Sequence, residues 1–242
     1  MRFPGVIGHR GAALRAPENT LAGFRKAAEL GCRMVEFDVR LTLDEQAVVF
    51  HDDDLKRITG SAGAVGATLL RDLAACDAGS HFGPAYRGEA IPSLEAALAL
   101  LRGLGLAFDL ELKPELGREQ ALAAVVARTL RHQWPAELPP PLVTSFLPEA
   151  TAALKRLMPE VACGYLAEVL PRDWRTAVAR LGAAAVVLNH RLLSPDAVRA
   201  VKAEGLPVLA YTVNHVARAR ELRALGLDAV ISDMPDAIMA AT

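Results

Sequence analysis

Aromatic residues and cysteines are scarce in this chain, and neither sign of charge predominates. Only 5% of its 242 residues are aromatic, and the formal net charge is -1. Without a cationic surplus, the chain lacks the electrostatic signature of a protein that binds nucleic acid. Its three cysteines form no CxxC pair and have no neighbour that would lower a thiol pKa, so we expect ordinary buried or half-buried thiols in a reducing compartment. These are Cys32, Cys76 and Cys163.

Long apolar segments are missing as well. No apolar run approaches the ~20 residues that a membrane-spanning helix needs. The first residues also lack a basic segment followed by a long apolar stretch, which is the pattern of a secretory signal. We therefore expect a cytoplasmic protein that acts on small molecules and makes no stable membrane association. The sequence leaves its oligomeric state open.

Short β-branched segments alternate with helix-like segments along almost the whole chain. A helical period joins Leu122, Val125 and Leu130, and glycines follow the expected helices at Gly31 and Gly182. Strands are expected at residues 5–9, 34–41, 106–113, 142–146, 162–167, 184–190, 206–214 and 227–233. Repeated strand–helix units of this kind are typical of a parallel sheet.

About eight such units in a chain of this length favour an α/β fold of the (β/α)8 TIM-barrel class. A doubly wound open sheet is the main alternative, although no GxGxxG motif follows the first strand. We expect a single domain, residues 1–242, with a small insertion after the second barrel strand at about residues 52–92. This segment is too long for an ordinary loop, and we expect it to lie over one mouth of the barrel. Residues 67–76 within it resemble a helix.

Two of the expected strands carry charges where a buried parallel strand should be apolar. Glu36 and Asp38 are two residues apart, so they point to the same side of their strand. Asp109, Glu111 and Lys113 likewise share one side of theirs. With the apolar residues facing the helices, the charged set is expected inside the barrel.

Buried charges are costly unless they are paired or bind a cation. Glu36, Asp38 and Glu111 lie toward the strand ends, where we expect them to bind one divalent ion. A donor set made only of oxygen atoms favours Mg²⁺ or Ca²⁺ over Zn²⁺. The alternative is a structural network of ion pairs with Lys113 and Arg10, and this is the favoured interpretation for Asp109, which lies deeper in its strand.

Two histidines follow strands that end at the same mouth. His9 ends the first strand, and His51 follows a short apolar segment directly after the strand of Glu36 and Asp38. Imidazole is the side chain best suited to exchange protons near neutral pH, which makes the two histidines candidate acid/base residues. Arg10 and Lys113 would add positive charge suited to a phosphoryl group. The other histidines, His81, His132, His190 and His215, are expected to be surface or loop residues.

Several motifs then resemble the glycerophosphodiester phosphodiesterase family, in order and over nearly the whole chain. They are "GHRG", "PENT", "EFDV", "HD", "ELK", "YTVN" and "ISDMP". The family is a TIM barrel with a small insertion that hydrolyses glycerophosphodiesters to glycerol 3-phosphate and an alcohol with a divalent metal. The resemblance implies that His9 and His51 are the acid/base pair and that Glu36, Asp38 and Glu111 bind the metal. It also implies that Arg10 and Lys113 contact the phosphate.

Other matched positions allow more than one interpretation. Glu18 in "PENT" is either a site residue or a carboxylate at a helix start. Tyr211 stands where the family often has tryptophan, so the shape of the alcohol pocket is open. Asn214 is either a pocket residue or a helix cap. The aspartates of "HDDD", residues 52–54, are expected to cap the first turn of the insertion.

Two competing functions fit parts of this pattern. A phospholipase-D-like barrel would use a similar pocket with two histidines on lipids, and it would form a cyclic phosphate. It would also be expected to have an apolar or basic rim facing a membrane. A non-catalytic phosphate-binding module is the second competitor, but a binding protein needs no pair of histidines.

Overall fold

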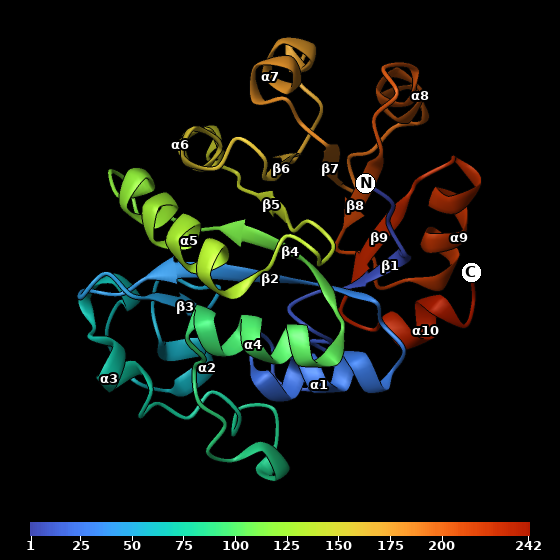
Figure 1. Ribbon diagram of the computed structural model, residues 1–242. Helices are drawn as coiled ribbons and strands as arrows, with labels where there is room; N and C mark the ends of the chain where they lie inside the picture. The colour runs from blue at the N-terminus through green and yellow to red at the C-terminus, as the bar shows by residue number, and fades with distance from the viewer.

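The chain folds into a closed barrel of eight parallel strands with helices on its outside (Figure 1). The computed structural model describes residues 1–242. The barrel strands are β1 (Gly5–Gly8), β2 (Met34–Leu41), β4 (Ala107–Leu112), β5 (Leu142–Thr144), β6 (Ala162–Ala167), β7 (Ala185–Asn189), β8 (Val208–Tyr211) and β9 (Ala229–Ser232). Because β1 pairs with both β9 and β2, the sheet closes on itself, and the expected TIM barrel is confirmed over the open-sheet alternative.

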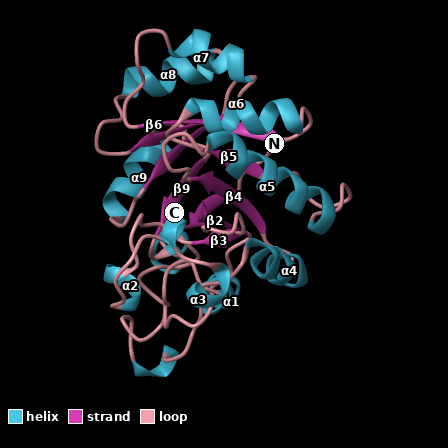
Figure 2. Cartoon of the chain, turned by 90° about the vertical axis from the view of Figure 1, so that its left-hand side faces the viewer, coloured by secondary structure: helices cyan, strands magenta, loops and turns pink.

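Helices enclose these strands, as Figure 2 shows, and all but the last of them, α10, connect one barrel strand to the next. They are α1 (Leu21–Glu29), α4 (Leu94–Leu104), α5 (Glu119–Gln133), α6 (Pro148–Leu157), α7 (Trp174–Leu181), α8 (Pro195–Ala203), α9 (Val216–Ala224) and α10 (Pro235–Met239). The apolar period predicted for α5 faces inward, with Leu122, Val125 and Leu130 all buried. Gly31 and Gly182 both have positive φ angles just after their helices, as a helix stop requires.

The inner face of the barrel changes from apolar at one end to acidic at the other. Along β2, Met34 belongs to an apolar cluster that includes Ile7 and Leu142, whereas Glu36 and Asp38 continue the same inward row. The outward residues of β2 pack in the main core beneath the helices. The inward-facing acidic residues Glu36 and Asp38 therefore lie toward the C-terminal mouth of the barrel, and the apolar cluster fills the barrel interior below them.

The segment after β2 departs from the barrel pattern. Strand β3 (Ala47–Val49) pairs antiparallel with the end of β2, and the chain then runs to α4 with only short helical pieces. These are α2 (Lys56–Thr59), α3 (Leu70–Leu73) and two 3-10 turns at Val65–Ala67 and Pro84–Tyr86. The helix expected at residues 67–76 is thus only four residues long. It ends at Leu73, and the chain then turns so that Leu73 and Ala78 pack in the same small core, separate from the core of the barrel.

This segment contacts the start of α1 beside the barrel mouth. Glu89 accepts a hydrogen bond from the backbone N–H of Ala22, and the Tyr86 hydroxyl donates to the carbonyl of Arg15. Elsewhere, Cys32 and Cys163 are buried free thiols whose pKa burial raises to about 11. No helix combines the length and apolar composition that crossing a membrane requires.

Candidate active site

Three carboxylates meet at the C-terminal mouth because two neighbouring strands carry them in register. In the parallel pair β2 and β4, Glu36 lies opposite Asp109 and Asp38 opposite Glu111. One oxygen atom from each of Glu36, Asp38 and Glu111 falls within 4.8 Å of the others. The structure therefore brings together the three residues that the sequence nominated as metal ligands.

Burial makes this cluster electrostatically strained. Burial and the adjacent Asp38 carboxylate raise the pKa of Glu36, and the same two causes raise the pKa of Glu111. For Asp38, burial also acts to raise the pKa, but the charges of Arg10 and Lys113 outweigh it and the pKa is lowered. A divalent cation would relieve the repulsion, and the buried set of oxygen donors fits Mg²⁺ or Ca²⁺.

Arg10 and Lys113 lie against the same carboxylates. Lys113 Nζ is 2.9 Å from Glu111 Oε1 and 3.5 Å from Asp38 Oδ1. Arg10 Nε is 3.2 Å from Asp38 Oδ2, but the two are poorly aligned, and this buried Nε has no hydrogen-bond partner. The ion pairs of Arg10 and Lys113 with these carboxylates, expected if the network were only structural, are therefore present. The Nε–H group of Arg10 nevertheless remains without a hydrogen-bond acceptor.

His9 is held in place by a sharp turn and by a residue from the far end of the chain. Arg10 has a φ of +48° and Gly11 of +92°, and a Cβ on Gly11 would lie 2.8 Å from the backbone of Gly23. This close approach to α1 explains the second glycine of "GHRG". His9 Nδ1 lies 2.5 Å from Asp233 Oδ1, and Nε2 lies 3.7 Å from Glu36 Oε2.

Asp233 is in turn fixed by Asn214. The amide nitrogen of Asn214 donates to Asp233 Oδ2 at 2.6 Å, and its oxygen accepts from the backbone N–H of Asp233 at 3.0 Å. The helix-cap interpretation of Asn214 is wrong, because α9 begins without a side-chain cap. Burial acts to lower the pKa of His9, but Glu36 and the bond with Asp233 outweigh it, so that pKa is raised.

His51 follows β3 and is oriented by its neighbour in sequence. Its Nδ1 lies 2.7 Å from Asp52 Oδ1, and Arg40 Nε donates to its backbone carbonyl at 2.7 Å. Burial, assisted by the positive charges of Arg10 and Lys113, lowers the pKa of His51 even though Asp38 and Asp52 oppose the shift. The two histidines therefore have pKa values moved in opposite directions.

Arg57 joins the two sides of this mouth. It donates to both oxygens of Asp52, at 2.6 and 3.0 Å, and to both oxygens of Glu18, at 2.7 and 2.8 Å. Glu18 also accepts from Arg10 Nη1 at 2.8 Å. A continuous chain of hydrogen bonds thus runs from His51 to Arg10 through a residue of α2.

Glu18 accordingly contacts two arginines, which is more than the helix-start interpretation requires. Next to it, Asn19 is buried, with φ +55°, and donates to Asp38 Oδ2 at 2.8 Å. Of the aspartates at residues 52–54, only Asp54 accepts a hydrogen bond from a backbone N–H in the first turn of α2, that of Lys56, so the capping interpretation is wrong for the other two. Asp53 pairs with Arg40 instead.

A small cavity of about 30 Å³ is bordered by Glu36 and Glu111 and by an aromatic pair. Tyr211 and Phe146 line it together with His9, and their rings meet edge to face with centroids 5.8 Å apart. Asp109 also borders it and accepts a hydrogen bond from Thr144 at 3.0 Å. The ion-pair network expected for Asp109 is therefore wrong, because a neutral hydroxyl is its partner and burial raises its pKa to about 8.

The remaining histidines lie away from the carboxylates. His81, His132 and His215 are exposed, as expected. His190 is a loop residue after β7, but it is only 8% exposed, so the surface interpretation is wrong for it. Its carbonyl accepts from Arg218, which draws the loop against α9.

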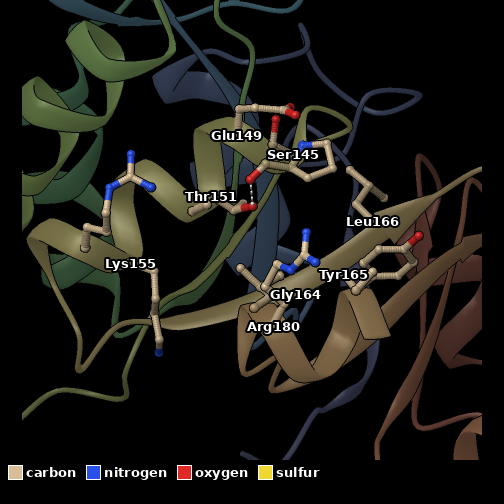
Figure 3. Close-up of a pocket in the computed structure, with 13 residues that line it drawn as sticks. Ser145, Glu149, Thr151, Lys155, Gly164, Tyr165, Leu166 and Arg180 are labelled. Carbon is tan, nitrogen blue, oxygen red and sulfur yellow. Dashed lines mark hydrogen bonds between the residues drawn. The ribbon is translucent and has the colours of Figure 1, made fainter. Parts of the chain in front are cut away.

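A second hollow of the molecule lies apart from this site. A groove of about 580 Å³ lies outside the barrel between α6 and α7, and Figure 3 shows Tyr165 and Arg180 among the residues that line it. None of the carboxylates or histidines described above borders it.

Sequence reasoning missed Asp233, Asn19, Arg40 and Arg57 as parts of this site. Asp233 and Asn19 lie inside the recognised motifs "ISDMP" and "PENT". The position of Asp233, an ionisable residue directly after the last strand, could have indicated that it belongs to the site. Arg57 gave none, because its partners are defined only by the folded path of the insertion.

Comparison of the whole chain with known proteins identifies its family. The model of the glycerophosphoryl diester phosphodiesterase family matches residues 9–237. YhdW of Bacillus subtilis (strain 168), provisionally named a glycerophosphodiester phosphodiesterase, is 34% identical over 243 residues, covering 97% of this chain and 96% of its own. A glycerophosphodiester phosphodiesterase of Caldanaerobacter subterraneus is 28% identical over 235 residues, with 97% and 96% covered.

Solved structures agree with the sequence relatives. An Oleispira antarctica phosphodiesterase, solved in complex with its product sn-glycerol-3-phosphate, superposes with a TM-score of 0.96 at 39% identity, over 98% of this chain and 96% of that one. The family match over nearly the whole chain and the shared fold confirm the resemblance noted from the motifs. The chain belongs to the glycerophosphoryl diester phosphodiesterase family of enzymes.

Proposed function

We propose that this enzyme hydrolyses glycerophosphodiesters to glycerol 3-phosphate and an alcohol, using one Mg²⁺ or Ca²⁺ ion and His9 and His51 as the acid/base pair. The observation that carries the proposal is the convergence of three buried carboxylates within 4.8 Å, with His9 Nε2 3.7 Å from one of them. The product bound to the Oleispira antarctica phosphodiesterase supports the substrate class.

Glu36, Asp38 and Glu111 would hold the ion, which would offset the negative charge of the phosphoryl oxygens when bound. Arg10 and Lys113 add positive charge beside it and would bind the same oxygens. The acidic cluster alone would repel a phosphodiester, so these cations are needed for binding as well as for rate.

Each histidine has its Nδ1 engaged with an aspartate, and its Nε2 makes no hydrogen bond. Asp233 holds Nδ1 of His9 and Asp52 holds Nδ1 of His51. With Nδ1 fixed in this way, Nε2 is the atom of each ring that exchanges a proton with the reacting groups. One ring takes a proton from the nucleophile, and the other gives a proton to the departing alcohol.

The surrounding residues act by positioning. Glu18 orients Arg10, and Asn214 orients Asp233. Tyr211 forms one wall of the cavity. The chain works as one domain, residues 1–242, in which the insertion at about residues 52–92 supplies Arg57 to the mouth.

The test is a coupled assay for glycerol 3-phosphate released from glycerophosphocholine. Protein treated exhaustively with EDTA should be inactive, and Mg²⁺ or Ca²⁺ should restore activity. Full activity after chelation would contradict the metal site. Phosphorus NMR provides a second readout, because a persistent cyclic phosphate would favour a phospholipase-D-like reaction over hydrolysis.

A further inference from the structure

Arg40 is a buried arginine near the mouth of the barrel to which the proposed catalytic step assigns no role. It continues the inward row of Glu36 and Asp38 on β2, two residues nearer the mouth, and is only 7% exposed. Arginine is seldom buried to this extent unless its donors are engaged. The partners of its guanidinium group therefore indicate what the residue does.

The strongest contact of Arg40 is made with the backbone of His51. Arg40 Nε donates to the His51 carbonyl at 2.7 Å, and a hydrogen bond from a charged donor is stronger than one between neutral groups. Nη1 lies 2.5 Å from Asp53 Oδ1, but the Asp53 side chain is 84% exposed, and ion pairs open to water contribute little. Nη1 reaches the carbonyl of Lys113 only at 3.5 Å. The bond to His51 is thus the main contact of this side chain.

His51 depends on this bond because no other hydrogen bond holds its main chain. The residue lies between β3 and α2, outside every helix and strand, and neither its N–H nor its carbonyl bonds to another backbone group. The residue before it is still held by the sheet, since the N–H of Phe50 donates to the carbonyl of Asp38 at 3.0 Å. The support from the sheet therefore ends at Phe50, and Arg40 supplies the next anchor.

The other candidate catalytic histidine is anchored without an arginine. The backbone N–H of His9 donates to the carbonyl of Ser232 at 2.8 Å, which ties it to β9. At His51, Asp52 orients the ring, and Arg57 holds the side chain of Asp52. Neither contact fixes the height of the His51 backbone above the barrel, so that position is set by Arg40.

We propose that Arg40 is a positioning residue that holds His51 at its working distance from the substrate through the hydrogen bond to the His51 carbonyl. The inference rests on the proposed function, in which Nε2 of His51 exchanges a proton with the reacting groups. A displacement of about 1 Å can cost as much as ~100-fold in rate. Loss of the anchor should therefore lower kcat while the barrel stays folded.

Three replacements of Arg40 separate the hydrogen bond from the charge. In Arg40→Gln the amide nitrogen takes the place of Nε along the side chain, so the donor is kept and the charge is lost. Arg40→Met has neither donor nor charge, and Arg40→Lys keeps the charge but has a methylene group in place of Nε. With glycerophosphocholine, kcat should fall about 10-fold in the Met and Lys variants and less than about threefold in Arg40→Gln, with KM within about twofold throughout.

A double-mutant cycle tests whether the effect passes through His51. In the His51→Ala background there is no imidazole to position, so adding Arg40→Met should lower kcat by less than about a further twofold. The matched control is Arg118→Met. Arg118 donates to the carbonyl of Thr42 at 2.9 Å, just after β2, but its contacts include no residue of the site, so kcat should not change. Thermal melting shows whether each variant is folded, and Arg40→Lys replaces Arg40→Met in the cycle if the latter is not.

The outcomes separate this inference from the proposed function. Equal losses in Arg40→Gln and Arg40→Met, or a large rise in KM, would mean that the charge of Arg40 acts on the substrate, and the inference would be wrong. A further 10-fold loss in the His51→Ala background, or wild-type kcat in both Arg40→Met and Arg40→Lys, would also overturn it. Each of these results leaves the hydrolysis by the unaltered enzyme intact, whereas a failure of the unaltered enzyme to hydrolyse glycerophosphocholine would remove the proposed function itself.

Discussion

The two halves of the barrel mouth differ in the side chains that form them: one is mainly charged and the other has exposed apolar residues. The charged half, which follows β9, β1, β2, β3 and β4, holds the carboxylates, both candidate catalytic histidines and the arginines that bind them. The apolar half, which follows β5 to β8, holds exposed residues such as Phe146 and Val169, and no ion pair joins its loops. One scaffold thus carries an ionic surface and a surface with exposed apolar side chains around the same mouth.

The difference shows how each surface keeps its shape. In the charged half most of the site's ionisable groups are held by another ionisable group, as when Arg57 holds Asp52 and Glu18 together. Loss of one partner leaves a buried or half-buried charge uncompensated, which is costly. The apolar half depends on packing, so a single substitution there should change substrate preference more than turnover.

The largest difference between the two halves is expected when their histidines are replaced by alanine. His51→Ala and His9→Ala should each lower kcat/KM for glycerophosphocholine at least ~100-fold, the lower range for acid–base catalysis. His190→Ala, which removes a buried histidine of the apolar half, should change it by less than about threefold, because His190 touches no reacting group. Steady-state measurements of kcat/KM on each folded variant test this prediction. Near-normal activity in His51→Ala or His9→Ala would remove that residue from the acid/base pair.

Arg57→Met tests whether the hydrogen-bonded chain across the charged half matters. The variant removes four bonds to Asp52 and Glu18, and we expect kcat/KM to fall about 10-fold through misplacement of His51 and Arg10. Arg57→Lys keeps the charge but cannot make all four bonds, so it should be intermediate.

The matched control for Arg57 is Arg175→Met. Arg175 is also exposed and ion-paired, lying 2.6 Å from Glu204, but it is on the outer side of α7. Exposed pairs of this kind contribute about 0–1 kcal/mol to stability, and activity should not change. Equal losses in the two arginine variants would mean that Arg57 acts only through general stability.

These residues also show what the sequence could predict. Alternating strands and helices favoured a barrel over an open sheet, and Glu36, Asp38 and Glu111 were recognisable because charges on buried strands are anomalous. Arg57 and Asp233 were not assigned roles, because their partners are remote: His9 and Asp233 are 224 positions apart and Glu18 and Arg57 are 39 apart. Only closure of the barrel and the path of the insertion bring such pairs together. The groove between α6 and α7 was equally invisible, since no pattern indicates how far apart two helices pack.

A pH profile distinguishes the electrostatic contribution of Asp52 from its contribution to geometry. The bond to Asp52 acts to raise the pKa of His51, against burial and the charges of Arg10 and Lys113. Asp52→Asn removes that support, so the His51 pKa should fall further. Whether His51 acts as base or acid, the limb of the kcat/KM profile that it controls should move to lower pH. Asp54→Asn, on the same loop but bonded only to the start of α2, should leave the profile unchanged. A limb that stays in place or moves to higher pH would show that Asp52 does not set the protonation of His51.

The smallest effect is expected in the apolar half, at Tyr211. Its hydroxyl donates to the carbonyl of Ala167 at 3.2 Å, and its ring packs against Phe146. Tyr211→Phe keeps the ring and loses only that bond, so the free energy of unfolding should fall by about 0.5–1.5 kcal/mol in urea titrations. Turnover of glycerophosphocholine should change less than in His9→Ala, His51→Ala or Arg57→Met, because the wall of the cavity remains. A loss of activity as large as that of Arg57→Met would mean that the hydroxyl contacts the substrate, and the division of the mouth into an ionic and a packing half would then fail at this residue.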